Sequence, residues 1–272
     1  MDEFQEANRQ NWEERAALHP GTDFYDVDGF LAGASTLKPL EREELGDVAG
    51  KSLLHLQCHF GLDTLSWARE GATVTGVDFS ETAIEKAREL RDETGLDARF
   101  IAANIYDLPA HLDDQFDIVF TSYGVLYWLP DIEGWAAVVA HFLAPGGTFY
   151  IAEIHPYTGS LASFDAAGNA TFEFPYFHEE DPLRFDEDGS YADPDAEFDH
   201  ATTYEWFHSM SDILTALLDA GLDIEFVHEH PFATFQMFPT MEQADDGWWY
   251  VPGLETNLPF TFSLKATKPA QK

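Results

Sequence analysis

Hydrophobic and polar residues in the middle of the chain follow a pattern that predicts strands separated by helices. Residues 52–56 form a short apolar run, residues 62–70 carry apolar side chains at helical spacing, and residues 73–77 form a second apolar run that ends on Asp78. Gly61 lies at the turn between the first run and the helix. This order predicts a strand, a helix and a second strand whose ends face one ligand crevice.

The same alternation continues beyond this unit. We expect helices at 80–95 and 133–142, and strands at 98–104, 115–124 and 148–156. Strands that alternate with helices in this way are typical of a doubly wound parallel sheet. Right-handed crossovers place the carboxyl ends of all parallel strands on one edge. The residues expected to converge there are Gly61, Asp78, Asn104, Thr121 and Glu153.

The flanking segments complete the predicted architecture. Residues 3–19 have apolar side chains at helical spacing and predict an N-terminal helix, which either covers the crevice or only packs against the sheet. Residues 156–204 are rich in Phe, Tyr, Pro and Asp, and predict an inserted β-rich flap with a hairpin across 184–193. The elements expected after the flap are a helix and two strands, at 209–220, 223–231 and 260–267.

The predicted fold class is therefore α/β, with a Rossmann-like, doubly wound sheet of seven mostly parallel strands. We divide the chain into four parts: an N-terminal helical cover at 1–45, a cofactor-binding α/β core at 46–155, a β-rich flap at 156–204, and a C-terminal helix with the last strands at 205–272.

Acidic residues dominate the charge of the chain. It has 14 Lys and Arg against 50 Asp and Glu, and a formal net charge of -36. Such a charge repels the phosphates of nucleic acids and the surface of anionic membranes, so neither is an expected partner. The acidic residues are spread over the whole chain, which favours a halophilic protein because high salt screens their repulsion.

Cysteine and hydropathy patterns limit the chain further. Cys58 is the only cysteine, which excludes an intramolecular disulfide and a cysteine-rich metal site. The first residues, MDEFQEANRQ, are polar and acidic, and no apolar run approaches the roughly 18 residues of a membrane span. We therefore expect a soluble, cytoplasmic protein, and the sequence does not indicate its oligomeric state.

The turn around Gly61 decides which nucleotide fits the crevice. Asp78 ends the second strand and is suitably placed to accept hydrogen bonds from a ribose diol. A dinucleotide site requires the pattern GxGxxG, whereas the corresponding residues here are Gln57, His59 and Gly61. A pyrophosphate cradle is therefore not expected, and a different nucleoside-type ligand is favoured.

Five segments, in order, resemble the class I S-adenosylmethionine-dependent methyltransferases, in particular their small-molecule branch. They are LLHLQCHFG, GVDFS, AANIYDLP, FDIVFTSYGVLYWLP and LAPGGTFYIAE. The first is similar to the family's turn of the form LLDLGCGTG. The resemblance implies that S-adenosylmethionine is the cofactor and that its methyl group passes to a small-molecule acceptor by in-line displacement. The alternative is a non-enzymatic protein that binds S-adenosylmethionine or another nucleoside in the same crevice.

The resemblance also assigns cofactor-binding residues. Gly61 would let the backbone approach the methionine part, and Asp78 would bind both ribose hydroxyls. Phe79 would lie against one face of the adenine, while Asn104 and Ile105 would contact its edge and other face. These assignments place the whole nucleoside at the ends of the first three strands.

The methionine end of the expected site departs from the family pattern. Thr121 would offer a backbone contact to the aminoacyl group. His55 replaces an acidic residue, which leaves the partner of the cofactor's ammonium group open between Gln57 and a bound water. Gln57 and His59 replace two glycines, so they require either negative φ angles or a strained turn.

Catalytic and acceptor-binding candidates lie beyond the cofactor residues. If the acceptor needs a base, Glu153 and His155 follow the fifth strand. His228 and His230 lie on one face of a strand without a third ligand in view, so no metal is expected. The acceptor would be small and either aromatic or apolar. The aromatic residues expected to surround it could equally form a small hydrophobic core of the flap itself. The residues predicted to contact it are Trp12, Tyr127, Tyr176, His178 and Trp206.

Overall fold

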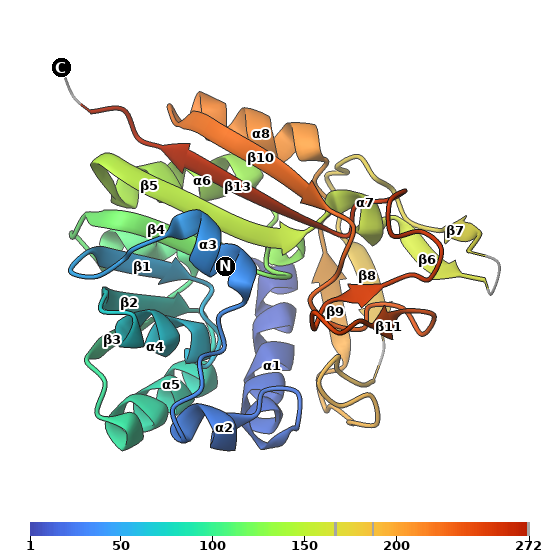
Figure 1. Cartoon of the computed structure of the whole chain (residues 1–272), viewed down its shortest axis with the longest axis horizontal. Helices are drawn as coiled ribbons and strands as arrows, with labels where there is room; N and C mark the ends of the chain where they lie inside the picture. Colours follow the sequence, from blue (N-terminus) through green and yellow to red (C-terminus); the bar gives the residue numbers. More distant parts are fainter. Residues whose placement is uncertain (166–167, 187, 271–272) are drawn as a thin grey trace.

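The computed structural model describes residues 1–165, 168–186 and 188–270, and its centre is a seven-stranded sheet. The strands of this sheet are β1 (Ser52–Leu56), β2 (Thr73–Asp78), β3 (Ala98–Ala102), β4 (Phe116–Ser122), β5 (Leu143–Ile154), β10 (Asp223–His230) and β13 (Thr261–Thr267). Their order is β10-β13-β5-β4-β1-β2-β3 (Figure 1). Neighbouring strands are parallel except at β13, which is antiparallel to both β5 and β10. The predicted seven-stranded, mostly parallel sheet is confirmed.

Helices cover both faces of this sheet (Figure 1). One hydrophobic cluster packs α3, α4 and α5 against the sheet, and a second packs α6 and α8 against the opposite face. In the described part of the chain, no helix combines the length and the apolar character needed to cross a bilayer. The helices are α1 (Glu3–Leu18), α2 (Val27–Leu31), α3 (Pro39–Leu45), α4 (Leu62–Arg69), α5 (Glu81–Thr94), α6 (Ile132–Phe142), α7 (Pro156–Gly159) and α8 (Met210–Asp219), with 3-10 turns η1 (His19–Gly21), η2 (Ile105–Ala110) and η3 (Leu126–Trp128).

The local sequence explains where these elements begin and end. The Ser80 side chain accepts a hydrogen bond from the N–H of Ala83 and starts α5, and Gly95, with a φ of 69°, ends it. Successive residues of a strand point to opposite faces, so Leu53 packs in the α4 cluster and Leu54 in the α6 cluster. The inner strands β1 and β4 are therefore buried on both sides, as their apolar sequences predict.

Helix α1 joins the core to the flap, and it lies beside the carboxyl edge of the sheet (Figure 1). The Glu13 carboxylate accepts hydrogen bonds from Ser80 Oγ at 2.9 Å and from the N–H of Thr82 at 2.8 Å, at the amino end of α5. On the flap side, Asn8 donates to the carbonyl of Tyr204 at 2.6 Å and accepts from its N–H at 2.7 Å. Because α1 is hydrogen-bonded both to α5 and to β9, it fixes the flap relative to the sheet edge.

The flap consists of short antiparallel pairs, β6 with β7 and β8 with β9. The predicted hairpin across 184–193 needs correction, because β8 pairs with the more distant β9; residue 187 lies outside the described residues. The segment 231–259 adds the pair β11–β12 and packs on β6 through a third hydrophobic cluster. These strands are β6 (Leu161–Phe164), β7 (Ala170–Phe172), β8 (Leu183–Asp186), β9 (Thr202–Glu205), β11 (Glu242–Gln243) and β12 (Trp249–Tyr250).

Candidate functional site

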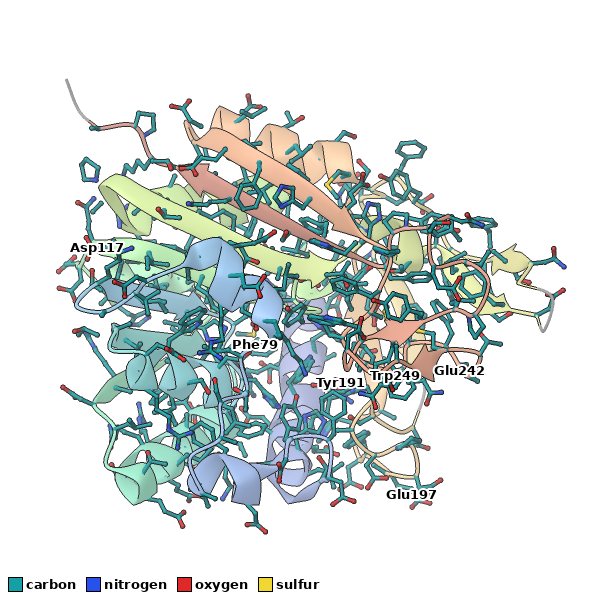
Figure 2. All side chains as sticks on the ribbon, in the orientation of Figure 1. Phe79, Asp117, Tyr191, Glu197, Glu242 and Trp249 are labelled. Carbon is teal, nitrogen blue, oxygen red and sulfur yellow. The ribbon has the colours of Figure 1, made fainter. Side chains whose placement is uncertain are left out.

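A cavity of about 1430 Å³ lies between the carboxyl edge of the sheet, α1 and the flap. Its lining includes Phe79 from the core together with Tyr191 and Trp249 from the flap side, which Figure 2 labels. Most ligand pockets have volumes of roughly 300–1,000 Å³. The cavity is therefore large enough for a nucleoside and a second small molecule.

The turn after β1 has a left-handed backbone at three alternate positions. The φ angles are 56° at Gln57, 51° at His59 and 81° at Gly61. Of the two options open for Gln57 and His59, the structure therefore has the strained turn, which costs about 1 kcal/mol per non-glycine residue. At Gly61 a Cβ atom would lie 2.7 Å from the ring of Phe100, so a side chain is excluded there. Gln57 and His59 therefore adopt the left-handed backbone conformation that glycine would adopt more easily.

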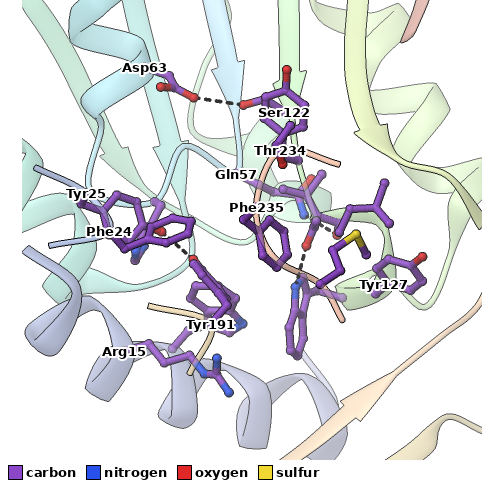
Figure 3. A pocket seen from close by; sticks show the side chains of 18 of the residues that line it. Arg15, Phe24, Tyr25, Gln57, Asp63, Ser122, Tyr127, Tyr191, Thr234 and Phe235 are labelled. Carbon is purple, nitrogen blue, oxygen red and sulfur yellow. Dashed lines mark hydrogen bonds between the residues drawn. The ribbon is translucent and has the colours of Figure 1, made fainter. Parts of the chain in front are cut away.

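The side chain of His59 connects the turn to the cover and the flap. Its Nε2 lies 2.9 Å from Nδ1 of His19, whose Nε2 lies 2.7 Å from Oγ of Ser190 in the flap. Burial lowers the pKa of His19 to about 3, and it also lowers the pKa of His59, so both imidazoles are neutral at pH 7. The hydroxyls of Tyr25 and Tyr191 form a second link, at 2.5 Å (Figure 3). These contacts link the N-terminal cover to the turn after β1 and to the flap along this wall of the cavity.

Asp78 ends β2 and lines the cavity. Its Oδ1 accepts from the N–H of Ser80 at 3.0 Å, and its Oδ2 accepts from the N–H of His59 at 2.8 Å. Burial raises the pKa of Asp78 to about 6, so the carboxylate is mainly ionised at neutral pH. The cavity brings this carboxylate together with most of the residues predicted to bind the cofactor. Those that line it are Gln57, His59, Gly61, Asp78, Phe79, Asn104 and Ile105.

The assignment of Thr121 needs correction. Strand β4 continues to Ser122, and Thr121 is fully buried within the sheet, opposite Ile151. It does not line the cavity, whereas Ser122 and Tyr123 do. The position expected for Thr121 is therefore taken by the next two residues, because Thr121 is still paired within the sheet and β4 ends at Ser122.

Asp63 also lines the cavity, although it was not predicted from the sequence. It lies in the first turn of α4, and its carboxylate accepts from Thr36 Oγ1 at 2.5 Å and from Ser122 Oγ at 3.3 Å (Figure 3). His55 also lines the cavity: its Nδ1 lies 2.8 Å from Thr64 Oγ1. The available signal was an acidic residue two positions after Gly61, at the amino end of a helix.

Glu153, predicted as a base, is a structural residue and does not line the cavity. Its buried carboxylate accepts hydrogen bonds from the N–H groups of residues 124–126 and of Ile154. Because these bonds fix the loop, the carbonyl of Val125 is placed to accept from Gln57 Nε2 at 3.1 Å. Glu153 therefore acts on the cavity indirectly, by holding the lining residues Gly124 and Val125 and, through Val125, Gln57.

His155 also lies outside the cavity lining, so its assignment as a base needs correction. Its Nε2 lies 2.8 Å from Glu229 Oε1. His228 bonds to Glu44 through Nδ1 at 2.7 Å, and its neighbour His230 bonds to a serine hydroxyl. Within the described ranges, no group of three or more His, Cys, Asp or Glu side chains is arranged to hold a metal.

Of the five residues predicted to contact the acceptor, Trp12 and Tyr127 line the cavity and three do not. Trp206 is buried just after β9, and the hydroxyl of Tyr176 accepts from the backbone N–H of residue 210. His178 Nδ1 is bound to the carbonyl of residue 207. Other aromatic residues from the part of the chain after the α/β core line the cavity instead. They include Phe174, Phe185, Tyr191, Phe207, Phe235, Phe238 and Trp249.

The sheet order, the reversed β13, the turn after β1 and the carboxylate at the end of β2 together define the class I methyltransferase fold. Residues 53–147 match the family model described as a methyltransferase domain. The resemblance found in the sequence motifs is therefore confirmed, and residues 53–147 are similar to a methyltransferase domain.

Particular proteins are similar over longer stretches. The ubiquinone biosynthesis O-methyltransferase of Klebsiella pneumoniae subsp. pneumoniae is 29% identical over 159 residues, which are 52% of this chain and 65% of that enzyme. The match thus spans less than two thirds of that relative. The S-adenosylmethionine dependent methyltransferase from Mesorhizobium loti superimposes with a TM-score of 0.59 and 24% identity, over 87% of this chain and 99% of its own. DhpI in complex with SAH has a TM-score of 0.55 at 18% identity, with 99% and 98% coverage.

Proposed function

We propose that this protein transfers a methyl group from S-adenosylmethionine to a small-molecule acceptor. The observation that carries the proposal is that one cavity joins the ends of β1, β2 and β3 to an aromatic extension under the flap. Two of the similar proteins, the ubiquinone biosynthesis O-methyltransferase and the Mesorhizobium loti protein, are methyltransferases. A purely nucleoside-binding protein would not need the aromatic extension.

The residues present fit the cofactor. Asp78 offers an ionised, oriented carboxylate to a ribose diol, and Phe79 and Ile105 supply apolar surface for an adenine. At Gly61 the absence of a side chain lets a ligand approach the backbone. When bound, S-adenosylmethionine supplies an electrophilic methyl group.

The chain then contributes mainly by positioning the acceptor. The extension is lined by Phe174, Phe235 and Phe238, so it suits a planar, apolar or aromatic acceptor. Helix α1 and the flap both line the cavity and are held together through Asn8, so they fix the walls against which the acceptor packs. In-line displacement gains much of its rate from holding the two reactants in the right geometry.

Titration calorimetry with S-adenosylmethionine and with S-adenosylhomocysteine, in molar KCl, tests the cofactor. We expect both to bind, and a protein that binds neither overturns the proposal. Release of S-adenosylhomocysteine in a screen of phenols, amines and thiols then tests turnover. Cofactor binding without turnover across such a library favours the alternative, a non-enzymatic S-adenosylmethionine-binding protein.

We also propose that the protein is halophilic and cytoplasmic, with neither nucleic acid nor membranes as partners. The support is its formal net charge of -36, which repels polyanions and is tolerated best where salt screens it. Electrophoretic mobility shifts with DNA and RNA check the first part, and retention of either by the protein at high salt contradicts it.

A further inference from the structure

Asp63 presents a buried carboxylate to the cavity, and its direct partners are neutral. It accepts from the hydroxyls of Thr36 and Ser122, and within the described residues it forms no ion pair. Lys38 also lines the cavity but is exposed to solvent and lies beyond ion-pair distance. Burial raises the pKa of Asp63, and the hydrogen bonds from Thr36 and Ser122 and the positive charge of Lys38 offset this effect only in part. A buried carboxylate of this kind is costly unless a cation pairs with it.

Two further acceptor atoms line the same end of the cavity. Oε1 of Gln57 is buried and has no hydrogen-bond partner among the residues described, because the bond to Val125 uses the amide nitrogen. Nε2 of His55 is also buried without a partner in that part of the chain, and its Nδ1 lies beside Thr64. Burial lowers the pKa of His55 to about 3, so the imidazole is neutral and can accept a hydrogen bond.

We propose that Asp63 binds the ammonium group of the amino-acid end of S-adenosylmethionine, with Gln57 Oε1 and His55 Nε2 as the other acceptors. An ammonium group has three N–H donors and one positive charge, which match three acceptors of which one is charged. The assignment rests on the proposed function. It gives Asp63 the role that an acidic residue at position 55 would otherwise have.

The position of Asp63 agrees with this role. It is next to the turn at Gly61 and is bonded to Ser122 at the end of β4, whereas Asp78 lies at the end of β2 (Figure 3). A ligand with its ribose on Asp78 and its chain over the turn therefore extends toward Asp63. The charged end of the ligand then meets a carboxylate that has no direct ion-pair partner among the described residues.

The test compares two ligands with the same nucleoside. S-adenosylhomocysteine carries the amino-acid group, and 5′-methylthioadenosine lacks it. Calorimetry in molar KCl should show that Asp63→Asn weakens S-adenosylhomocysteine binding by about 10- to 100-fold, the cost of losing a charged hydrogen bond. The affinity of Asp63→Asn for 5′-methylthioadenosine should stay within about twofold of the wild-type affinity, because this ligand has no ammonium group for the carboxylate to bind.

Glu41→Gln is the matched control. Glu41 is a buried carboxyl on α3 that accepts from Tyr123 Oη at 2.8 Å and does not line the cavity, so both affinities should be unchanged. Where Asp63→Asn does not fold, Gln57→Leu is judged by the same criterion, a loss for S-adenosylhomocysteine alone. Unchanged affinity of the folded variant, or equal loss of both ligands, overturns the assignment. Wild-type protein that binds neither ligand overturns the proposed function itself.

Discussion

The backbone N–H of His59 donates a hydrogen bond of 2.8 Å to Oδ2 of Asp78. This bond ties the strained turn after β1 to the carboxylate at the end of β2. With the N–H of Ser80 on Oδ1, it fixes the orientation of a side chain that burial would otherwise disfavour in its charged form. The two parts of the expected nucleoside site are therefore one hydrogen-bonded unit.

The pKa of Asp78 predicts a pH dependence of cofactor binding. Burial raises this pKa to about 6, and the ionised form is the better acceptor for a ribose diol. Affinity for S-adenosylhomocysteine should therefore rise as the pH increases through about 6 and then level off. Asp78→Asn should bind about 10- to 100-fold more weakly and lose this dependence. Calorimetry on both sides of the pKa checks it, with the exposed Asp114→Asn as control. An equal pH dependence in Asp78→Asn would refute the assignment.

The positive φ of His59 predicts a difference between two substitutions that both remove its ring. His59→Ala keeps the cost of a left-handed non-glycine residue, and His59→Gly removes it. The glycine variant should therefore be more stable than the alanine variant by about 1 kcal/mol, although both lose the contact with His19. Urea unfolding in molar KCl measures the two free energies of unfolding. A more stable alanine variant would show that the turn relaxes to negative φ.

Much of the core could be predicted because its signals are local. The bounds expected for β1 agree with the structure, and Ser80 and Gly95 mark the ends of α5 as their chemistry predicts. The pairing of β8 with β9 was not predictable in this way. It depends on residues brought together across a long loop, which α1 holds through Asn8.

The site was predictable at the strand ends and less so between them. Asp78 could be assigned to the ribose because it ends an apolar strand at the edge of the sheet where a nucleoside binds. Asp63 was missed because its place on the cavity depends on contacts with Thr36 and Ser122, which are far away in the sequence. Glu153 was predicted as a base, but its carboxylate binds backbone N–H groups. The sequence does not show which backbone groups a side chain will contact.

Glu13 predicts how α1 is held on the core. Burial opposes its charge, but hydrogen bonds from Thr82 and Ser80 outweigh this and lower its pKa. The stabilisation is therefore present above the ordinary pKa of a glutamate and is lost as the pH falls through the lower, folded-state value. Glu13→Ala should reduce the free energy of unfolding by about 1–2 kcal/mol at neutral pH. It should also raise hydrogen exchange in α1.

The control for Glu13 is Glu85→Ala, an exposed residue on the surface of α5. Urea titration and hydrogen exchange, both in molar KCl, should leave this variant close to wild type. If Glu13→Ala changed hydrogen exchange in α1 no more than Glu85→Ala does, the hydrogen bonds between Glu13 and the amino end of α5 would not be what holds α1 on the core.

The net charge predicts that stability depends on salt. Fifty acidic residues against 14 basic ones repel one another strongly at low ionic strength, and at about 1 M salt the screening length falls to roughly 3 Å. The midpoint of thermal unfolding should therefore rise steeply with KCl. Substituting NaCl at equal ionic strength should give nearly the same rise. A midpoint independent of KCl would contradict the halophilic proposal.

Glu153 distinguishes a base from a positioning residue. Its oxygens accept from the N–H groups of Val125 and Leu126, so Glu153→Gln places an amide nitrogen against donors and should destabilise the protein by about 1–3 kcal/mol. Methyl transfer should fall because the loop no longer orients Gln57, and S-adenosylhomocysteine affinity should fall with it. The pH profile of kcat should keep its shape, since the carboxylate does not line the cavity. If the variant instead retained its stability and cofactor affinity but lost a limb of that profile, Glu153 would be a base.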